Sequence, residues 1–337
     1  MSRRYLITGA QGLIGRYLTA RILDLEPDGE VVGIGRSSRI DASFTHAISG
    51  RDGPEPAPVP EELLANLGER YRYQRLSLLD TPRLRELVRA LRPDFIFHLA
   101  SALHTAPVRE LVETNIEGTA SLMDAVDAAS GSEAVVILGS SGSVYGEPPV
   151  VPVRESAPCN PANMYGVTKL AAEHIVRIGA ARNGRAFVTA RIFNVVGPGQ
   201  TESHVCARLA AQLAARPRAL ETGALHASRD FIDVRDVAAG LLLLARRGGR
   251  GETYNLGSGR ETPVHLVLSE LLRISGSEVE IVRRDERPAG VRRHCADVSR
   301  LQALGFVPAY SLGESLRDLF AYHQAVRNGR GRERIPA

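Results

Sequence analysis

The chain has 337 residues, enough for one large domain or two ordinary ones, each with a sizeable buried core. Hydrophobic residues make up 44% and charged residues 24%, which is typical of soluble globular proteins and excludes disordered or fibrous chains. The net charge is only +4, and the arginines are dispersed instead of gathering on one face as in nucleic-acid binders. We therefore expect no nucleic-acid partner, and scattered arginines suit a small anionic ligand.

The three cysteines, Cys159, Cys206 and Cys295, lie far apart and lack metal-ligand spacing. This argues against both a disulfide framework and a zinc site. The amino terminus leads directly into a short apolar run without an export signal, and no segment approaches the roughly 20 apolar residues that span a bilayer. We expect a cytoplasmic protein with no bound metal and no membrane partner.

Short apolar runs alternate with helical patterns over the first 140 residues. Strands are predicted at residues 5–8, 31–34, 95–99 and 135–138, and helices at residues 13–25, 81–91 and 112–129. Strands that alternate with helices indicate an α/β fold with a doubly wound parallel sheet. Residues 40–71 interrupt this rhythm with several prolines, and are predicted to form an inserted loop, mobile at its centre, with one short helix near residues 61–66.

The second half of the chain is less regular. Helices are predicted at residues 162–183, 204–215 and 264–275, and strands at residues 186–192, 231–234 and 254–256, of which the last two return to the main sheet. A larger domain would then comprise residues 1–192 and 231–257. A smaller, discontinuous domain would comprise residues 193–230 and 258–325, followed by a basic tail at residues 326–337.

A glycine-rich turn follows the first strand and opens the first helix. Gly9 permits a tight turn, Gly12 lets backbone amides approach a pyrophosphate, and Gly15 allows the helix to pack closely on the strand. A flexible turn is the simpler interpretation, but the position between strand and helix favours dinucleotide binding.

Two further segments carry groups that can move a proton. Tyr165 and Lys169 share one face of a predicted helix, and an ammonium one turn away favours the tyrosine phenolate. Ser141 lies in a serine-rich turn after the strand at residues 135–138, where a doubly wound sheet places its ligand groups. The alternatives are an exposed helix pair and a turn that satisfies its own backbone.

Together these motifs resemble the short-chain dehydrogenase/reductase family. The segments at residues 98–101, 115–119, 191–199, 229–237, 254–257 and 287–288 resemble its extended branch, the NAD-dependent epimerase/dehydratase family, whose members act on nucleotide-linked sugars. The carboxy-terminal half is similar in particular to the GDP-4-keto-6-deoxymannose reductases of this family, although residues 102–108 differ. The resemblance implies a Rossmann sheet for the larger domain, a nucleotide-sugar site in the smaller one, and a homodimer packed through the helices at residues 112–129 and 162–183.

The resemblance also assigns roles to individual residues. The catalytic residues would be Ser141, Tyr165 and Lys169. Besides the tyrosine and the lysine, the cofactor would contact Gly9, Gln11, Gly12, Leu13, Ile14, Gly15, Arg36, Ser37, Arg39, Leu79, Leu99, Ala100, Ser101 and Asn115. The substrate would contact Ser141, Ser143, Asn194, Arg229 and Arg287, because guanidinium groups suit a diphosphate. Each arginine could instead form a surface ion pair.

The end of the second predicted strand bears on the choice of cofactor. Arg36, Ser37 and Arg39 follow it, and no acidic residue stands there to hold the ribose hydroxyls of NAD. An arginine favours the 2′-phosphate of NADP(H), which we therefore expect. NAD(H) stays open, because Arg36 could stack on the adenine without discriminating.

Ser143 bears on the reaction. Sugar dehydratases of this family carry an acidic residue at the matching position, so the serine disfavours dehydration. The leading hypothesis is NADP(H)-dependent reduction of a 4-keto group on a nucleotide-linked deoxysugar. The alternatives are an NAD-dependent 4-epimerase that uses the same residues and, from another class, a non-catalytic NADP(H) redox sensor.

Overall fold

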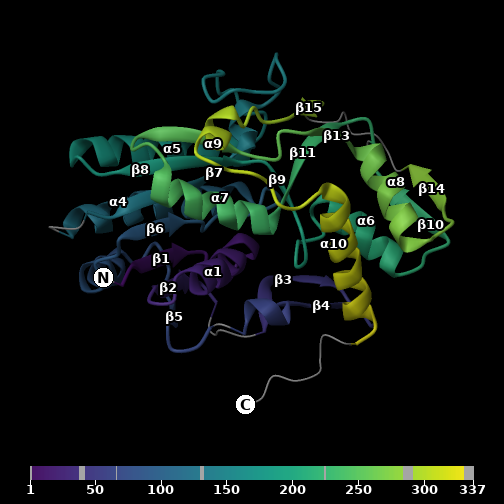
Figure 1. The fold of residues 1–337 in the computed structure, drawn as a ribbon, viewed down its shortest axis with the longest axis horizontal. Coiled ribbons are helices and arrows are strands. Elements are labelled where there is room, and N and C mark those ends of the chain that lie inside the picture. Colours follow the sequence, from purple (N-terminus) through teal and green to yellow (C-terminus); the bar gives the residue numbers. More distant parts are fainter. Residues whose placement is uncertain are drawn as a thin grey trace.

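A seven-stranded parallel sheet forms the centre of the molecule's larger part. The computed structural model describes residues 2–37, 42–65, 67–129, 133–223, 225–283 and 291–329 (Figure 1). The strands lie in the order β12-β8-β7-β6-β1-β2-β5, with parallel neighbours throughout. Their bounds are β1 (Arg4–Thr8), β2 (Glu30–Gly35), β5 (Tyr71–Arg75), β6 (Phe95–His98), β7 (Val135–Ser141), β8 (Phe187–Ile192) and β12 (Glu252–Leu256). The predicted doubly wound α/β fold is confirmed.

Helices cover both faces of this sheet. α1 (Leu13–Leu25) and α7 (Val234–Arg247) bury their apolar sides on one face. On the other face lie α2 (Thr81–Leu91), α4 (Gly118–Ala128) and α5 (Met164–Arg182). Successive β1 side chains supply both cores, since Tyr5 and Ile7 point to one face and Leu6 to the other. The chain runs outward from β1 through β2 to β5 and then returns to β6, so the strand order reverses between β1 and β6.

Side-chain caps start several helices where the sequence changes from loop to helix. Asp80 caps α2 by accepting from the Arg83 amide, and Asn163 caps α5 by accepting from the Gly166 amide. The helix predicted at residues 112–129 divides into a π-helical segment, Val112–Glu117, that follows the short α3 (Val108–Leu111), and α4. Such π segments are frequent at functional sites.

The smaller part has its own core, formed mainly by three helices that lie together in Figure 1. These are α6 (Val205–Ala214), α8 (Val264–Ser275) and α10 (Leu312–Arg327). Two small sheets accompany them, one of β10 (Ala219–Thr222) and β14 (Glu280–Arg283), and one in which β11 (Ser228–Asp233) pairs with β9 (Asn194–Val196), β13 (Glu261–Pro263) and β15 (Arg293–His294). The short α9 (Ser299–Ala303) follows.

Two expectations for the second half of the chain have different outcomes. The strand at residues 254–256 is confirmed as part of β12 in the main sheet. The expected return of residues 231–234 to that sheet is wrong, because Phe231, Ile232 and Asp233 pair with β9. A buried apolar run fits either sheet, so its pattern alone does not choose the partner. Residues 330–337 of the predicted basic tail lie outside the described residues, and Val326 and Arg327 end α10.

The expected loop at residues 40–71 contains an ordered hairpin. β3 (Ser43–Ser49) pairs antiparallel with β4 (Pro54–Pro58), and a short 3₁₀ turn, Glu61–Leu63, follows. The prolines of β4 stand at alternate positions, which a strand with one partner tolerates. Phe44 and Ile48 of the hairpin join the core beside α1. Hairpin and α10 lie side by side (Figure 1), where the Tyr322 hydroxyl donates to the Pro58 carbonyl at 2.9 Å.

Candidate active site

A cavity of about 550 Å³ lies where the two parts of the molecule meet, at the carboxyl ends of β1, β6 and β7. One side is lined by the glycine turn and by the ends of β6 and β7, and the other by β9, β11 and residues 200–204. This is the point at which the strand order reverses, where doubly wound sheets bind ligands.

The glycine turn fits a pyrophosphate. Gly9 has φ +70°, a conformation that favours glycine, and its amide donates to the Ile34 carbonyl at 2.9 Å. A Cβ atom on Gly15 would lie 2.4 Å from the Gly9 carbonyl oxygen, so only glycine lets α1 start this close to β1. Gly12 is the N-cap of α1 and lines the cavity, so the positive end of the helix is available to an anion.

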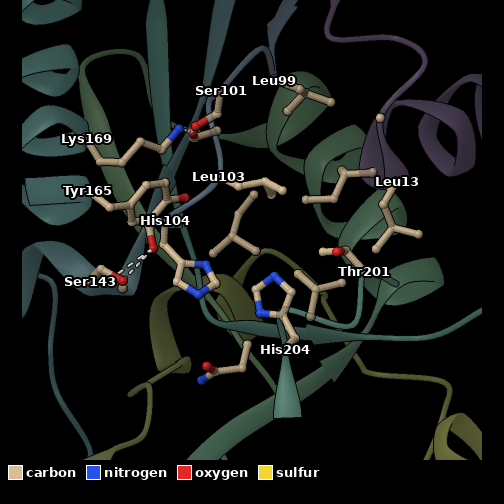
Figure 2. Close-up of a pocket in the computed structure, with 18 of the residues that line it drawn as sticks. Leu13, Leu99, Ser101, Leu103, His104, Ser143, Tyr165, Lys169, Thr201 and His204 are labelled. Carbon is tan, nitrogen blue, oxygen red and sulfur yellow. Dashed lines mark hydrogen bonds between the residues drawn. The ribbon is translucent and has the colours of Figure 1, made fainter. Parts of the chain in front are cut away.

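Ser141, Tyr165 and Lys169 line the cavity and come from two elements. Figure 2 shows Tyr165 and Lys169 on the same side of it. Ser141 ends β7, and its hydroxyl accepts a bond from the Ser143 amide and donates to the Ser143 hydroxyl, both at 3.2 Å. Tyr165 and Lys169 lie one turn apart at the start of α5. The Lys169 ammonium donates to the Gly139 carbonyl at 2.6 Å, which fixes it beneath the end of β7.

Burial controls the protonation of this group. It raises the pKa of Tyr165, whereas hydrogen bonds with Ser141 and Ser101 act in the opposite direction. Burial also lowers the pKa of Lys169 to about 8, opposed by the negative charge of Glu173. At neutral pH the tyrosine therefore carries its proton and can donate it, while the lysine is close to the point at which it releases one.

A buried polar network, which we call the floor, reaches the cavity through Ser140. Arg191 on β8 donates to both carboxylate oxygens of Glu173, from Nε at 3.0 Å and from Nη2 at 2.8 Å. The Ser140 hydroxyl donates to the same carboxylate at 2.5 Å. Arg191 Nη1 donates to the Tyr145 hydroxyl at 2.9 Å, which in turn donates to Asn255 at 2.7 Å. The network joins α5, β7, β8 and β12 directly below Ser141 and Lys169.

Asn115 connects the cofactor side to α5. It lies in the π-helical segment, and its side-chain oxygen accepts from the Ala102 amide at 3.0 Å and the Ser101 hydroxyl at 3.1 Å. Its amide group donates to the Thr168 hydroxyl at 2.9 Å. Asn115 thus holds the loop after β6 against the helix that carries Tyr165.

The opposite side of the cavity carries a cation. Arg229 on β11 donates to the carbonyls of Ser228 at 2.8 Å and Arg292 at 3.3 Å, and burial lowers its pKa. Among the described residues no carboxylate lies within ion-pair distance of its guanidinium. Nearby, His294 stacks on Phe193 with ring centroids 4.7 Å apart, and burial lowers its pKa to about 4. A positive charge that no carboxylate of the described residues neutralises suits an anionic ligand group.

The structure brings most of the expected site residues to the cavity wall. The lining includes Gly9, Gly12, Leu13, Ile14, Gly15, Leu99, Ser101, Ser141, Ser143, Tyr165, Lys169, Asn194 and Arg229. Gln11, Arg36, Ser37, Leu79, Ala100 and Asn115 are not part of that lining. Arg39 and Arg287 lie outside the described residues.

Several residues of the cavity wall were not predicted from the sequence. Thr45 and His46 come from the hairpin, His104 from the loop after β6, and Thr201 and His204 from the segment before α6. Single histidines in polar loops have no spacing that marks them, and the hairpin itself was expected to be a mobile loop. Only the fold brings them together.

The described part of the chain contains no group of three or more histidine, cysteine or acidic residues arranged to hold a metal ion. None of the helices in it combines the length and the apolar character needed to cross a membrane.

Comparison with known proteins agrees with this geometry. Residues 5–257 match the NAD dependent epimerase/dehydratase family. The chain is 30% identical over 336 residues to GDP-6-deoxy-D-mannose reductase of Pseudomonas aeruginosa, covering 95% of this chain and 97% of that protein. It is also 30% identical over 327 residues to UDP-glucose 4-epimerase of Mycolicibacterium smegmatis, covering 93% and 96%.

A solved structure extends the likeness to three dimensions. The reductase RMD from Pseudomonas aeruginosa in complex with NADPH superposes with a TM-score of 0.78 at 29% identity, covering 96% of this chain and 99% of that one. Relatives of this kind are NAD(P)-dependent enzymes that act on nucleotide-linked sugars. The chain therefore belongs to the NAD-dependent epimerase/dehydratase family, in the extended branch of the short-chain dehydrogenases, and is an NAD(P)-dependent enzyme.

Proposed function

We propose that this enzyme uses NADP(H) to reduce a 4-keto group on a nucleotide-linked deoxysugar. The observation that carries the proposal is the convergence of Ser141, Tyr165 and Lys169 on a cavity in which Ser143 stands beside Ser141 and none of the described lining residues is acidic. The reductase from Pseudomonas aeruginosa, 30% identical over nearly the whole chain, supports the same reaction.

In this proposal each residue has one task. Ser141 donates a hydrogen bond to the sugar ketone oxygen, and Tyr165 transfers its hydroxyl proton to that oxygen as it becomes negative. Lys169, held by the Gly139 carbonyl, stabilises the tyrosine oxygen after the proton has left. The bound reduced nicotinamide would supply the hydride.

Dehydration fits the site less well. Removal of water from a sugar needs a group that takes a proton from carbon and one that gives a proton to the departing hydroxyl. Ser143 has an alkyl hydroxyl at the position where an acid would be needed, and this hydroxyl accepts a hydrogen bond from Ser141. The wall at this point can form hydrogen bonds but cannot act as a carboxylic acid.

A 4-epimerase is the second candidate, supported by the similarity to UDP-glucose 4-epimerase. The same three residues serve this reaction, because it requires the hydride to leave the sugar carbon and return to its opposite side. A 4-epimerase would use NAD and keep it bound. The two candidates therefore differ in whether cofactor must be exchanged.

The proposed preference for NADP(H) rests on Arg36 at the end of β2. Its guanidinium is largely exposed and lies 2.9 Å from Glu110, so it can turn toward a 2′-phosphate without leaving a buried position. Ser37 and Arg39 follow it in sequence, and Arg39 lies outside the described residues. NAD(H) remains the alternative for an epimerase.

The proposed substrate site uses Asn194 and Arg229, together with Arg287 beyond the described residues, to bind the diphosphate. Asn194 donates to the Asp230 carbonyl at 3.1 Å and lines the cavity beside β11. The position of Arg229 in the cavity, without an acidic partner among the described residues, supports this role.

We also propose a homodimer in the cytoplasm. Met164, Val167 and Ile178 are exposed apolar side chains of α5, one of the two helices expected to pack against a second copy. The three cysteines are free thiols, which suits a reducing compartment. Sedimentation of the purified protein would test the dimer.

A coupled measurement tests the reaction. The enzyme is mixed with NADPH and a GDP- or dTDP-linked 4-keto-6-deoxyhexose, and the absorbance band of reduced nicotinamide is followed. We expect that band to disappear in proportion to the keto sugar added. Interconversion of UDP-glucose and UDP-galactose without added cofactor would instead support the 4-epimerase. No turnover of either kind would contradict both candidates.

A further inference from the structure

Three histidines from separate elements form one side of the cavity, next to the catalytic tyrosine. We call His46 of β3, His104 of the loop after β6 and His204 of the segment before α6 the histidine wall. The His104 ring lies edge-on to Tyr165, with centroids 6.5 Å apart, and its centroid is 5.1 Å from that of His204 (Figure 2). A sugar whose reacting carbon lies at Tyr165 would therefore contact this wall.

The hairpin that supplies His46 is held on both sides. The Ser49 amide and hydroxyl donate to the Glu202 carboxylate at 2.6 and 2.7 Å, which ties the hairpin to the segment that carries His204. Arg327 of α10 donates to the Gly50 carbonyl at 3.1 Å. The wall is thus a fixed surface of the cavity.

The wall is uncharged at neutral pH. Burial lowers the pKa of His46 and of His104, and it lowers that of His204 to about 4. His46 and His104 also oppose a charge on His204, whereas the Gly199 carbonyl and Glu202 favour one on His46. Each neutral imidazole offers one donor and one acceptor, which is the hydrogen-bonding pattern of a hydroxyl group.

The remaining lining near the wall is also uncharged. Leu103, Ser143, Gln200 and Thr201 lie in this region. Among the described residues that line the cavity, the charged side chains are Lys169, which donates to the Gly139 carbonyl, and Arg229, which the proposed function assigns to the diphosphate. A carboxylate on the sugar would therefore lose water here without gaining a cation.

We propose that the histidine wall selects nucleotide-linked sugars that carry only hydroxyl and methyl groups, and excludes hexuronates. This inference rests on the proposed function, because it takes the sugar to be held at Tyr165 and its diphosphate at Arg229. An unpaired carboxylate in a partly dry site should weaken binding at least tenfold relative to the matching hexose.

Calorimetric titration of the wild-type enzyme tests the inference with three series of probes. These are UDP, UDP-glucose and UDP-glucuronate; GDP, GDP-mannose and GDP-mannuronate; and dTDP, dTDP-glucose and dTDP-glucuronate. In each series whose diphosphate binds, we expect the hexose to bind at least tenfold more tightly than the hexuronate. Equal or tighter binding of the hexuronate would overturn the inference and leave the diphosphate site intact. If none of the three diphosphates bound, the proposed function would fail with the inference.

A charged variant locates the effect in the wall. His104→Arg places a cation beside the sugar, so the ratio of hexuronate to hexose affinity should rise about tenfold or more while affinity for the diphosphate alone is retained. His265→Arg, on the exposed side of α8, is the matched control and should leave the ratio unchanged. An unchanged ratio in His104→Arg, with diphosphate binding intact, would contradict the inference.

If His104→Arg loses diphosphate binding through misfolding, His46→Gln provides a second measurement. Glutamine keeps one donor and one acceptor but changes their positions, so hexose affinity should fall several-fold while diphosphate affinity stays constant. Unchanged hexose affinity would show that the hairpin does not contact the sugar, and would overturn the role of His46 in the wall.

Discussion

The floor of the cavity and its histidine wall differ in how their buried polar atoms are satisfied. In the floor, both oxygens of Glu173 and the guanidinium of Arg191 have hydrogen-bond partners. In and behind the wall, the buried atoms His46 Nε2 and Gln200 Oε1 and both ring nitrogens of His323 have none within the described structure. The floor is complete before any ligand binds, whereas the wall keeps hydrogen-bonding capacity that water or a ligand can use.

The floor and the histidine wall affect two different properties of the enzyme. The paired floor joins the strand that ends at Ser141 to the helix that carries Lys169, since Ser140 of β7 and Glu173 of α5 are hydrogen-bonded. The wall faces the variable part of the substrate and is built from three loops or edges. Substitutions in the floor should therefore change stability and rate, and substitutions in the wall should change which sugar binds.

The largest expected effect is on the reaction itself. Tyr165→Phe removes the proton donor and little volume, so turnover should fall by a factor on the order of 10² to 10⁴. Cofactor affinity, measured by titration of the variant, should stay within a few-fold. Near-normal turnover with a keto sugar would show that another group supplies the proton.

Removing the Glu173–Arg191 ion pair of the floor should have a comparably large effect, on the stability of the protein instead of on its turnover. Glu173→Gln leaves the buried Arg191 charge without its carboxylate, which should lower the free energy of unfolding by about 3–5 kcal/mol. The control is Glu113→Gln, which breaks an exposed pair with Arg109 and should change the free energy of unfolding by less than about 1 kcal/mol. Denaturant titration of both variants measures the difference, and equal losses would mean that the buried pair contributes no more than a surface one.

Arg229→Ala tests the substrate side of the cavity. Loss of one charge-assisted contact to a phosphate should cost roughly 1.5–3 kcal/mol, or about ten- to a hundred-fold in affinity for the nucleoside diphosphate. Arg293→Ala removes a neighbouring arginine that pairs with Glu261 on the surface, and should leave that affinity unchanged. Calorimetry with GDP, UDP and dTDP decides the matter, because equal affinities for the native enzyme and Arg229→Ala would remove the proposed diphosphate role.

Acid should destabilise the protein through its buried histidines. Burial lowers the pKa of His204, His294 and His323 to about 4 from the usual 6.5. Between about pH 4 and pH 6.5 the unfolded chain therefore binds more protons than the folded protein. The contribution of these histidines to stability is full above about pH 6.5 and is lost as the pH falls toward about 4.

His323→Leu isolates one of these histidines. Each contributes up to about 1.4 kcal/mol per pH unit, so the variant should lose stability less steeply on acidification. Exposed His265→Leu should keep the native slope. Thermal unfolding of both variants, measured between about pH 4 and pH 7, gives the dependence of stability on pH for each. An identical dependence in the two variants would mean that His323 is protonated in the folded protein.

The smallest expected effect concerns the cofactor. Arg36→Asp should weaken NADPH binding by about tenfold and spare or improve NADH binding, because a carboxylate repels the 2′-phosphate and accepts ribose hydroxyls. Arg72→Asp, at an exposed pair with Glu30, controls for the change in surface charge. Equal affinity of the native enzyme for the two cofactors would remove the basis of this expectation.

The features that could be predicted from sequence are those that local patterns encode. The glycine turn, the helix pair Tyr165 and Lys169, and the bounds of α1 and α2 follow from spacing and periodicity over a few residues. The parallel, doubly wound arrangement of the sheet follows from the alternation of strands and helices, and the family resemblance added the roles of Ser141 and Arg229.

The features that could not be predicted depend on long-range pairing. Residues 43–58 have few strand signals and three prolines, yet β4 pairs with β3 because Phe44 and Ile48 are buried against α1. The edge strand β5 alternates aromatic and polar residues, of which only Tyr71 is fully buried. His46, His104 and His204 lie far apart in sequence, so nothing local marks them as neighbours.

The prolines of β4 have a consequence for association between molecules. Since proline has no N–H group, the bonds that β4 donates to β3 must come from Glu55 and Ala57, and the nitrogens of Pro54, Pro56 and Pro58 face the outer edge. That edge therefore presents carbonyl oxygens without donors, one of which already accepts from Tyr322. An extended segment of another chain would find no donors to pair with there, so the β4 edge is a poor template for aggregation.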